Sequence, residues 1–410
     1  MVYRSLCLLV GLIVAGIGSA EAQQAASFSL VDALALARER SPALAAERVR
    51  LDAARRARER VGVLPDPVVE FRSENWTRSN SSENLPLDTY LTVTQPLDLG
   101  GRRTARRASL DARIGMAEVS TASALKRLID EVVASYGEAV RQRDRHRVLE
   151  TYAADVAELV RVVERRVAAG TVAEADLLRM MTEEARAAGD AAAADIGAMR
   201  AFLHLRALLG FAGPVSIDAL VRPVVDAPDV ADASEAVERR PDVQTARQAV
   251  ETARSLARLE AASARPDAAV ESGLKRTGDV NTGVLAVTMA LPLFDRNRVG
   301  RTLAEAQVTA SEHELERVRT LARAEITAHH DAASRLADRA ATIESQLVEP
   351  ALGAREAARS AFAAGALDIV RLLDTEQAAT EAVLVAIDIQ VAAAVAGIEA
   401  RLAAGREPLP

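Results

Sequence analysis

The amino-acid sequence predicts a mainly α-helical protein with a small β part, built from one structural unit that occurs twice. Half of the residues are hydrophobic but only 3% are aromatic, and alanine dominates, which is typical of long, closely packed helices. Two very long stretches contain almost no helix breakers. Short alternating segments, typical of strands, occupy corresponding positions in the two halves of the chain.

Residues 1–22 have the features of a secretory signal peptide. Arg4 supplies a positive charge, the apolar run Leu6–Gly18 follows, and small residues up to Ala22 fit a cleavage site. An N-terminal membrane anchor is the alternative interpretation. The only cysteine, Cys7, lies inside the apolar run, so the mature chain would contain no thiol and could form no disulfide. An exported chain without disulfides indicates a bacterial envelope.

Charge and hydropathy restrict the partners further. The net charge is −7 and no basic patch stands out, so we expect no nucleic acid partner. After residue 22 no apolar segment approaches the roughly 20 residues that a membrane helix needs. Any membrane insertion would therefore use strands of a closed barrel, because only helices and closed barrels satisfy every backbone polar group in lipid.

The two repeats are predicted at 23–213 and 214–410, and together they form one domain. Each repeat begins with a helix and reaches a Pro-Asp pair that opens a strand. A second strand, a turn, a long helix, a break and a further helix follow in both repeats. The breaks read VAAGTVAEADLLR and FAAGALDIVRLLD, and their glycines and leucines keep the same separation along the chain.

The strands are short and alternate between apolar and polar residues. In the second repeat, Leu285, Val287 and Met289 share a face opposite Ala286 and Thr288. The predicted strands span about 66–77, 86–97, 267–277 and 282–293. This length suits a tilted strand that crosses an outer membrane, although a hairpin of a soluble sandwich has the same local pattern. Four strands cannot close a barrel of useful bore, so several copies would have to share one.

The long helices are predicted at about 102–169 and 299–364. The first contains no proline, and from Arg301 to Ala364 the only breakers are Pro350 and Gly353. At 1.5 Å per residue, each helix would form a rod of roughly 100 Å, which is too long for a globular domain of this size. Heptad-like spacing of the apolar residues predicts that these rods pack side by side.

The motifs QPLDLGGRR and LPLFDRNR follow the second strand of each repeat. Together with the duplicated layout and the two breaks, they resemble the TolC-type outer-membrane efflux channels, the outer membrane factors of tripartite efflux systems. The resemblance covers roughly residues 28–404. The wording of both motifs is most similar to ducts that work with heavy-metal-exporting pumps. Members of this family carry out no catalytic step, so the resemblance implies no enzyme activity, no cofactor and no resident metal site.

The resemblance also implies a homotrimer, in which a 12-stranded outer-membrane β-barrel continues as a long periplasmic α-helical barrel. A periplasmic adaptor and an inner-membrane efflux pump would be the protein partners, and outer-membrane lipid would surround the barrel. The chain would turn from barrel to tunnel at Pro96, Gly100, Gly101, Pro292 and Phe294, where the glycines permit a tight bend.

At the periplasmic end, the family closes its duct with acidic residues that follow each helical break. Asp374 and its first-repeat counterpart Asp176 match those positions. Arg371 stands where the family often has an acidic residue, so we expect a mixed ring of Arg371 with Asp374 or Asp368. Such charges could bond between protomers and select ions. The alternative is that they are solvated charges at a helix start, where aspartate also favours the helix dipole.

The turns beside these charges resemble the sites where family members meet the helical hairpin of the adaptor. The candidate contact residues are Gly170, Thr171, Gly365 and Ala366. The alternative interpretation is that each glycine merely ends a helix, as glycine does in many proteins.

Other residue patterns in the sequence are weaker signals of a functional site. His329 and His330 are adjacent, but we expect His329 to be a packed helix residue rather than a metal ligand. No phosphate-binding loop or nucleophile motif occurs. The strand aromatics Phe71, Tyr90 and Phe294, together with Trp76, are candidates for the girdles of a membrane barrel.

The predicted function is therefore a passive exit duct for substrates delivered by a pump and an adaptor, with heavy-metal cations as the expected substrate. A duct for drugs or small organic molecules is the alternative substrate class. A periplasmic coiled-coil adaptor or structural protein is the alternative of another kind. A secreted hydrolase would need a convergent polar site, which the sequence does not indicate.

Overall fold

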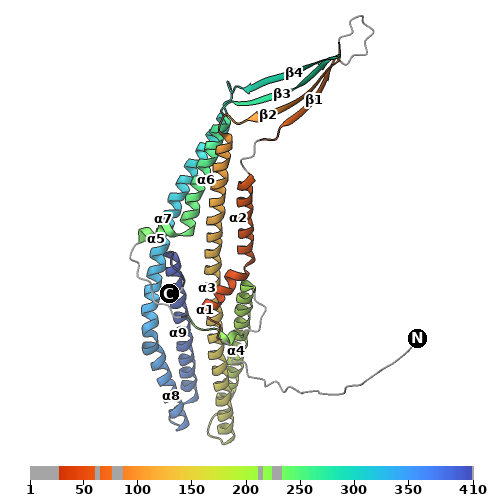
Figure 1. Ribbon diagram of the computed structural model, residues 1–410. Coiled ribbons are helices and arrows are strands. Elements are labelled where there is room, and N and C mark those ends of the chain that lie inside the picture. Colours follow the sequence, from red (N-terminus) through yellow and green to blue (C-terminus); the bar gives the residue numbers. More distant parts are fainter. Residues whose placement is uncertain (1–26, 61–64, 76–85, 211–215, 224–232, 409–410) are drawn as a thin grey trace, which may run out of the picture.

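The computed structural model describes residues 27–60, 65–75, 86–210, 216–223 and 233–408. The predicted signal peptide and Trp76 lie outside these ranges. The molecule is a long helical rod with a small sheet at one end and two helical turns at the other (Figure 1).

The first repeat contains four helices and two strands among the described residues. They are α1 (Leu30–Arg40), α2 (Pro42–Arg60), β1 (Val68–Glu74), β2 (Asp88–Leu97), α3 (Arg102–Ala168) and α4 (Glu174–Leu209). The second repeat contains α5 (Ala233–Arg239), α6 (Pro241–Ser263), β3 (Asp267–Thr277), β4 (Val280–Ala290), α7 (Arg298–Ile343), α8 (Glu349–Ala363) and α9 (Ile369–Ala403). Each repeat therefore runs through helices, two strands, a long helical segment, a turn and a last helix.

Local sequence explains where the leading helices begin. Ser29 caps α1, because its hydroxyl accepts the Asp32 N–H while the Asp32 carboxylate accepts the Ser29 N–H. Pro42 and Pro241 start α2 and α6, where a missing N–H costs nothing. The RERSP and VERRP motifs therefore mark the same bend in both repeats.

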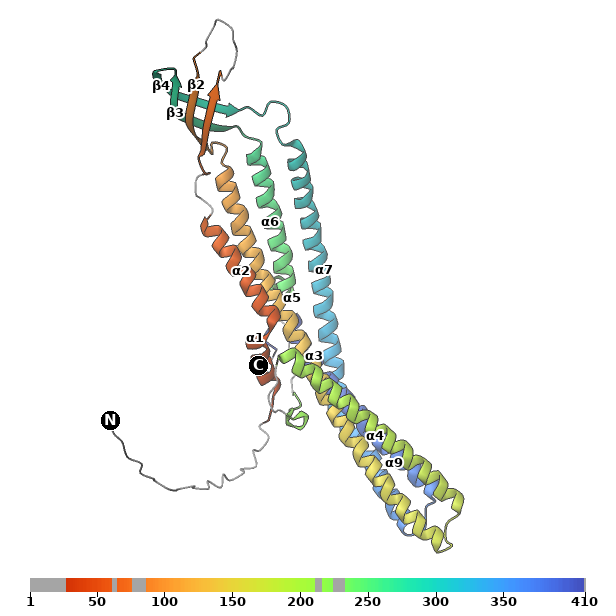
Figure 2. The same cartoon turned by 90° about the vertical axis from the view of Figure 1, so that its right-hand side faces the viewer.

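Helix α3 is the spine of the molecule. It has 67 residues, so at 1.5 Å per residue it extends about 100 Å. Near the sheet it packs between α2 and α6, and near the other end it packs against α4 and α9 (Figure 2). The largest apolar core lies midway, where Val132, Tyr136 and Val140 of α3 meet residues of α1, α4 and α9.

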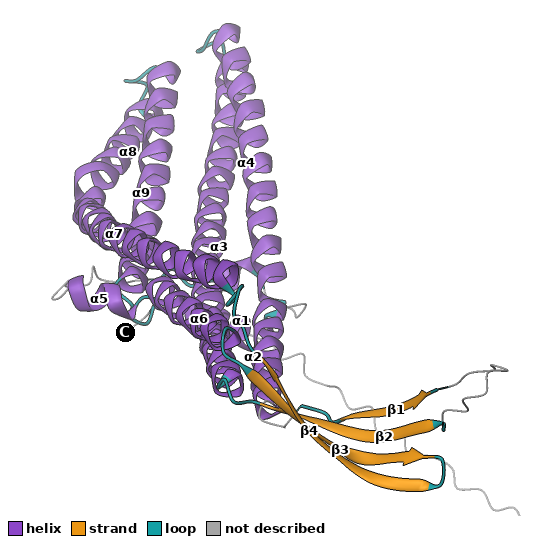
Figure 3. Ribbon diagram, turned by 90° about the horizontal axis from the view of Figure 1, so that it is seen from above, coloured by secondary structure: helices purple, strands orange, loops and turns teal. Residues whose placement is uncertain are grey.

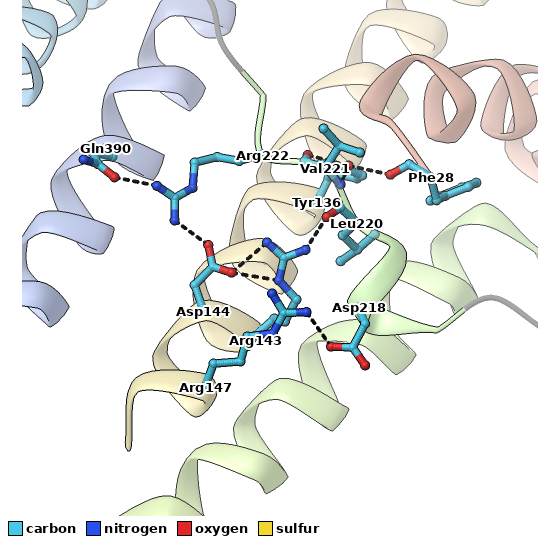
Figure 4. Close-up of polar contacts among 10 residues, drawn as sticks. All are labelled: Phe28, Tyr136, Arg143, Asp144, Arg147, Asp218, Leu220, Val221, Arg222 and Gln390. Atoms are coloured by element: carbon cyan, nitrogen blue, oxygen red, sulfur yellow. Dashed lines mark hydrogen bonds and ion pairs between the residues drawn. The ribbon is translucent and has the colours of Figure 1, made fainter. Parts of the chain in front are cut away.

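A polar cluster at this midpoint joins the N-terminal segment and residues 216–223 to α3 and α9 (Figure 4). The Tyr136 hydroxyl lies 2.7 Å from the carbonyl oxygens of Phe28 and Val221 and accepts the Val221 N–H at 2.9 Å. Burial raises the pKa of Tyr136 to about 12. Asp144, itself buried, accepts hydrogen bonds from Arg143 at 2.8 Å and from Arg222 at 2.6 Å.

The second rod differs from the single regular helix expected over about 299–364. Helix α7 ends at Ile343, a π-helical turn spans Glu344–Val348, and α8 begins at Glu349. Pro350 explains the break, because its nitrogen carries no hydrogen and cannot donate to the carbonyl four residues earlier. Viewed along the rod, α8 leaves α7 at a clear bend (Figure 3).

Helix α9 corrects a second expectation. It has 35 residues, and among the described residues it is the helix long and apolar enough to cross a membrane, by length and composition only. The expectation that no later segment approaches membrane length was therefore too strict. In the structure, 44% of its most apolar stretch is buried, and α9 packs against α3, α7 and α8.

Candidate functional site

The four strands form one antiparallel sheet in the order β1-β2-β3-β4. Phe71, Leu91 and Leu274 align across three neighbouring strands, so their side chains share one face of the sheet. Leu285 lies on the same face and is 78% exposed, and Phe71 is 72% exposed. A soluble hairpin would bury such a face against a core. The exposed apolar face instead suits contact with lipid.

The opposite face of the sheet carries polar side chains on β1, β2 and β3. Arg72, Tyr90 and Lys275 align across β1, β2 and β3. The Arg72 guanidinium carbon lies 4.5 Å and the Lys275 Nζ 5.1 Å from the centre of the Tyr90 ring. Lys275 also lies 3.0 Å from the Asp88 carboxylate. Tyr90 therefore lies on the polar face, which contradicts its expected place in an outer aromatic girdle.

The sheet joins the helices through two turns of similar shape. Gly101 precedes α3 with a φ of 72°, and Asn297 precedes α7 with a φ of 50°. Gly100 lies in the same turn as Gly101 and packs closely against the end of α6. A Cβ added to Gly100 would lie 3.1 Å from the Arg265 Cβ. These glycines lie in the turn predicted from the sequence.

Two of the predicted turn residues lie after β4, and one lies elsewhere. Pro292 and Phe294 follow the strand, and Phe294 is 89% exposed. Pro96 instead lies within β2, opposite Ala269 of β3. Its missing N–H is tolerated there because the pairing of β1 with β2 does not extend past Thr94.

At the other end of the rod, two nearly identical turns connect α3 to α4 and α8 to α9. Gly170 and Gly365 have φ values of 72° and 77°, a left-handed conformation that favours glycine. The N–H of Thr171 donates to the Arg166 carbonyl at 2.9 Å, and the N–H of Ala366 donates to the Ala361 carbonyl at 2.8 Å. Both turns are therefore Schellman motifs, which end helices in this way.

A groove of about 520 Å³ lies between these two turns. Thr171, Asp176, Gly365 and Asp368 contribute to its lining, together with apolar residues such as Phe362. The structure thus brings together four of the predicted adaptor and gate residues in one hollow. Gly170 and Ala366 belong to the same turns but do not line the groove.

The predicted gate residues of the second repeat lie at the start of α9. Asp368 is the N-cap residue, and its carboxylate accepts the Arg371 N–H at 2.9 Å. The Arg371 guanidinium lies 3.7 Å from the same carboxylate, and both side chains are exposed. Asp374 is also exposed one turn further along α9 and does not line the groove. Asp368 therefore has a structural role as a helix cap in addition to any role at a constriction.

A charged cluster beside the groove was missed by sequence reasoning. Arg359 of α8 donates to Asp155 of α3 at 2.6 Å and to Glu376 of α9 at 2.8 Å. Glu376 is only 1% exposed. Its hydrogen bonds to Arg359 raise the pKa of the guanidinium. Glu376 follows Leu372 and Leu373 in the apolar stripe of α9, and a carboxylate in such a stripe signals a buried partner.

Two further contacts tie the α8–α9 hairpin to the α3–α4 hairpin. The carboxylate of Glu183 accepts hydrogen bonds from the Tyr152 hydroxyl at 2.8 Å and from the Gln377 amide at 2.7 Å. Burial, reinforced by the nearby Glu183, raises the pKa of Tyr152. Arg166 donates to the Phe362 carbonyl at 3.1 Å and stacks on the Phe362 ring at 4.3 Å. Polar contacts therefore hold the two hairpins together within one chain.

Known proteins share this architecture over nearly the whole chain. A crystal structure of a membrane protein from Pseudomonas aeruginosa superposes with a TM-score of 0.79 at 20% identity, covering 92% of this chain and 93% of that one. The cobalt-zinc-cadmium resistance protein CzcC of Cupriavidus metallidurans is 26% identical over 366 residues, 87% of this chain and 84% of its own length. The nickel-cobalt-cadmium resistance protein NccC of Alcaligenes xylosoxydans xylosoxydans is 26% identical over 78% of this chain and 72% of its own length.

The family model for outer membrane efflux proteins matches residues 33–211 and 233–405, one match in each repeat. This match confirms the resemblance seen in the motifs, and it decides against the periplasmic adaptor and the secreted hydrolase. The chain therefore belongs to the outer membrane efflux protein family, whose members are non-enzymatic, TolC-like channels of the outer membrane that extend into the periplasm.

Proposed function

We propose that three copies of this chain form one continuous duct, which carries substrates passively from a periplasmic adaptor and an inner-membrane pump across the outer membrane. The observation that carries this proposal is the open four-stranded sheet with an exposed apolar face, mounted on a helical rod whose longest helix, α3, extends about 100 Å. Among the described strands, β1 and β4 have one unpaired edge each. Joining β4 of one copy to β1 of the next removes these edges and closes a barrel.

In this arrangement the polar face of the sheet lines the pore. Arg72, Tyr90, Lys275 and Asp88 would then stand in water, while Phe71 and its neighbours contact lipid. The assembly is tested by chemical cross-linking of the protein in native membranes. A trimer band supports the proposal, and a water-soluble monomer after removal of detergent contradicts it.

We assign the constriction to the periplasmic tip, with Arg371, Asp374 and Asp368 of the second repeat and Asp176 of the first as its charged residues. Support comes from the groove that Asp176 and Asp368 share and from the exposure of Arg371 and Asp374 beside it. Arg371→Ala combined with Asp374→Ala should raise ion conductance in planar bilayers if these side chains hold the tip shut. Unchanged conductance would remove both residues from the gate.

The adaptor is assigned to the same tip. Thr171 and Gly365 line the groove of about 520 Å³, together with apolar side chains such as Val172, Phe362 and Leu367. Such a hollow between two turns fits the end of a helical hairpin. Gly170 and Ala366 set the shape of the two turns through their backbone conformation and hydrogen bonds.

Heavy-metal cations are the substrate class that we favour. Support comes from two relatives. One is named a cobalt-zinc-cadmium resistance protein, and the other is named a nickel-cobalt-cadmium resistance protein. Within the described ranges, no group of three histidine, cysteine or carboxylate side chains is placed to hold a metal ion. Selection of the metal would therefore fall to the pump.

Deletion of the gene and a sensitivity screen test the substrate class. Greater sensitivity to cobalt, zinc or cadmium salts, reversed by the intact gene, supports the proposal. Sensitivity to drugs or small organic molecules, with unchanged metal tolerance, would favour the second substrate class instead.

A further inference from the structure

Arginines are concentrated where the sheet joins the helices. Residues 98–107 and 295–301 are each rich in arginine and hold a single aspartate, although the whole chain has a net charge of −7. The arginines of these two segments are Arg102, Arg103, Arg106, Arg107, Arg296, Arg298 and Arg301. This part of the molecule therefore has a charge opposite to that of the chain as a whole.

Some of these guanidiniums hold the junction together. Arg102 forms an ion pair with Asp267 and donates to the Ser263 carbonyl at 2.9 Å. Arg301 lies 3.7 Å from Glu305 in the next turn of α7. These arginines already have partners within the chain.

Four other arginines are exposed and form no ion pair with a described residue. They are Arg103, Arg106, Arg296 and Arg298. Arg103 and Arg106 line a small hollow of about 140 Å³ below the end of β2. Asp98 also lines this hollow, but its carboxylate accepts the backbone N–H groups of Arg102 and Arg103 and caps α3. The helix end is thus already satisfied, and the free groups are the guanidiniums.

Arg296 occupies a backbone position that favours glycine. Its φ is 47°, and that of Asn297 is 50°. A left-handed conformation costs an ordinary residue roughly 1–2 kcal/mol. In the corresponding turn of the first repeat, the residue with a positive φ is Gly101, at 72°. The Asn297 side chain fixes the turn by donating to the Glu260 carboxylate at 2.6 Å. Arg296 is therefore an exposed arginine in a backbone conformation that glycine adopts at lower cost.

Exposed apolar side chains accompany these arginines. Leu99, Leu293 and Phe294 are 62%, 63% and 89% exposed and lie in the same two turns. Arginine beside leucine and phenylalanine is the composition of a membrane interface, where the apolar parts enter the acyl region and the charge stays with the headgroups. The strands of the sheet end next to these turns, β2 at Leu97 and β4 at Ala290.

We propose that Arg103, Arg106, Arg296 and Arg298, the junction arginines, bind the phosphate groups of anionic phospholipids in the periplasmic leaflet of the outer membrane. Guanidinium groups bind phosphate oxygens through paired, charge-assisted hydrogen bonds. Because both repeats contribute, each copy of the chain binds lipid at two places around the duct. These contacts fix the depth at which the sheet sits in the bilayer.

The test compares lipid retention by the purified, intact protein in a non-ionic detergent. Phosphatidylglycerol and phosphatidylcholine are added separately, and bound lipid is measured by native mass spectrometry. Wild-type protein should bind phosphatidylglycerol more tightly. The variant Arg103→Gln/Arg106→Gln/Arg296→Gln should lose about fivefold in affinity per arginine, on the order of a hundredfold in total. Its affinity for phosphatidylcholine should stay unchanged.

A matched variant carries the same loss of charge far from the sheet, at Arg161, Arg179 and Arg335, which are also exposed and form no ion pair with a described residue. This variant should retain phosphatidylglycerol like wild type, and an equal loss in both variants would overturn the proposal. Displacement of the lipid by inorganic phosphate, at a concentration where sodium chloride of the same ionic strength leaves the lipid bound, would show a free-anion site and would also overturn it.

A second measurement applies if the glutamine variant does not assemble. Lysine at the same three positions keeps the charge and should keep most of the binding. Added salt should weaken phosphatidylglycerol binding by the wild-type protein, because exposed charges are screened. Binding that does not change with salt would contradict the assignment.

Discussion

Removal of the Arg359 guanidinium should loosen the tip of the rod. In Arg359→Gln, the carboxylate of Glu376 loses its charged partner while it remains 1% exposed. Breaking a buried ion pair by removing one partner costs about 3–5 kcal/mol. Arg359 itself is 34% exposed, so water can enter the vacated space, and the second pair with Asp155 contributes about 1 kcal/mol or less. We therefore expect a loss near the lower end, about 3 kcal/mol.

Hydrogen exchange of the backbone amides in the first turns of α9 measures this loss locally. A decrease of about 3 kcal/mol in the free energy of opening accelerates exchange roughly a hundredfold. Adding Glu376→Gln to Arg359→Gln should restore most of the protection, because no unpaired charge then remains buried. Arg355→Gln, one turn earlier on α8, is the matched control, since Arg355 forms no ion pair with a described residue. Unchanged exchange in Arg359→Gln, or a double variant no better protected than the single one, would refute the reasoning.

Three further predictions concern other parts of the rod. Leu285→Arg should lower the amount of folded protein in the outer membrane, because a charge on the lipid face costs about 2–4 kcal/mol. Thr282→Arg, on the polar face, should insert normally. Equal losses in the two variants would contradict the assigned faces. Tyr136→Phe should destabilise the midpoint by about 1–3 kcal/mol. The stability of the wild-type protein should fall as pH rises from 10 to about 12, because tyrosine in the unfolded chain loses its proton at lower pH than buried Tyr136. An equal melting temperature at pH 9 and pH 12 would count against the buried hydroxyl. Gly365→Trp should weaken adaptor binding in pull-down assays more than Gly365→Ala, which carries the same backbone strain without the bulk; normal binding by the tryptophan variant would leave the turn as a helix stop alone.

The faces of the sheet could be predicted from the sequence, because side chains in a strand alternate with a period of two. The alternation of Leu285, Val287 and Met289 is local information, and the structure places these residues on one exposed face. The contact of Arg72 with Tyr90 was not predictable in this way. It depends on which strands pair and in which register, and the alternation in β1 is weak.

Contacts between residues on different helices determine the features of the tip that the sequence did not reveal. Glu376 could have been noticed, since it interrupts an apolar stripe, but its partner Arg359 lies on a different helix. Helix α9 was overlooked as a segment of membrane length because Asp388, Gln390 and Glu399 interrupt its apolar residues. The arginines of the junction were hidden by the negative total charge, which averages over segments of opposite sign.

The π-helical turn at Glu344–Val348 affects how the long helical segment of the second repeat packs against neighbouring helices. One additional residue in a helix rotates everything beyond it by about 100°. The side of the second rod that meets α6 near the sheet is therefore out of phase with the side of α8 that meets α9 near the tip. In the first repeat, α3 is one continuous α-helix. The long helices of the two repeats therefore pack against their neighbours in different ways. Deletion of one residue in this turn would rotate α8 away from α9, while every strand would stay in place.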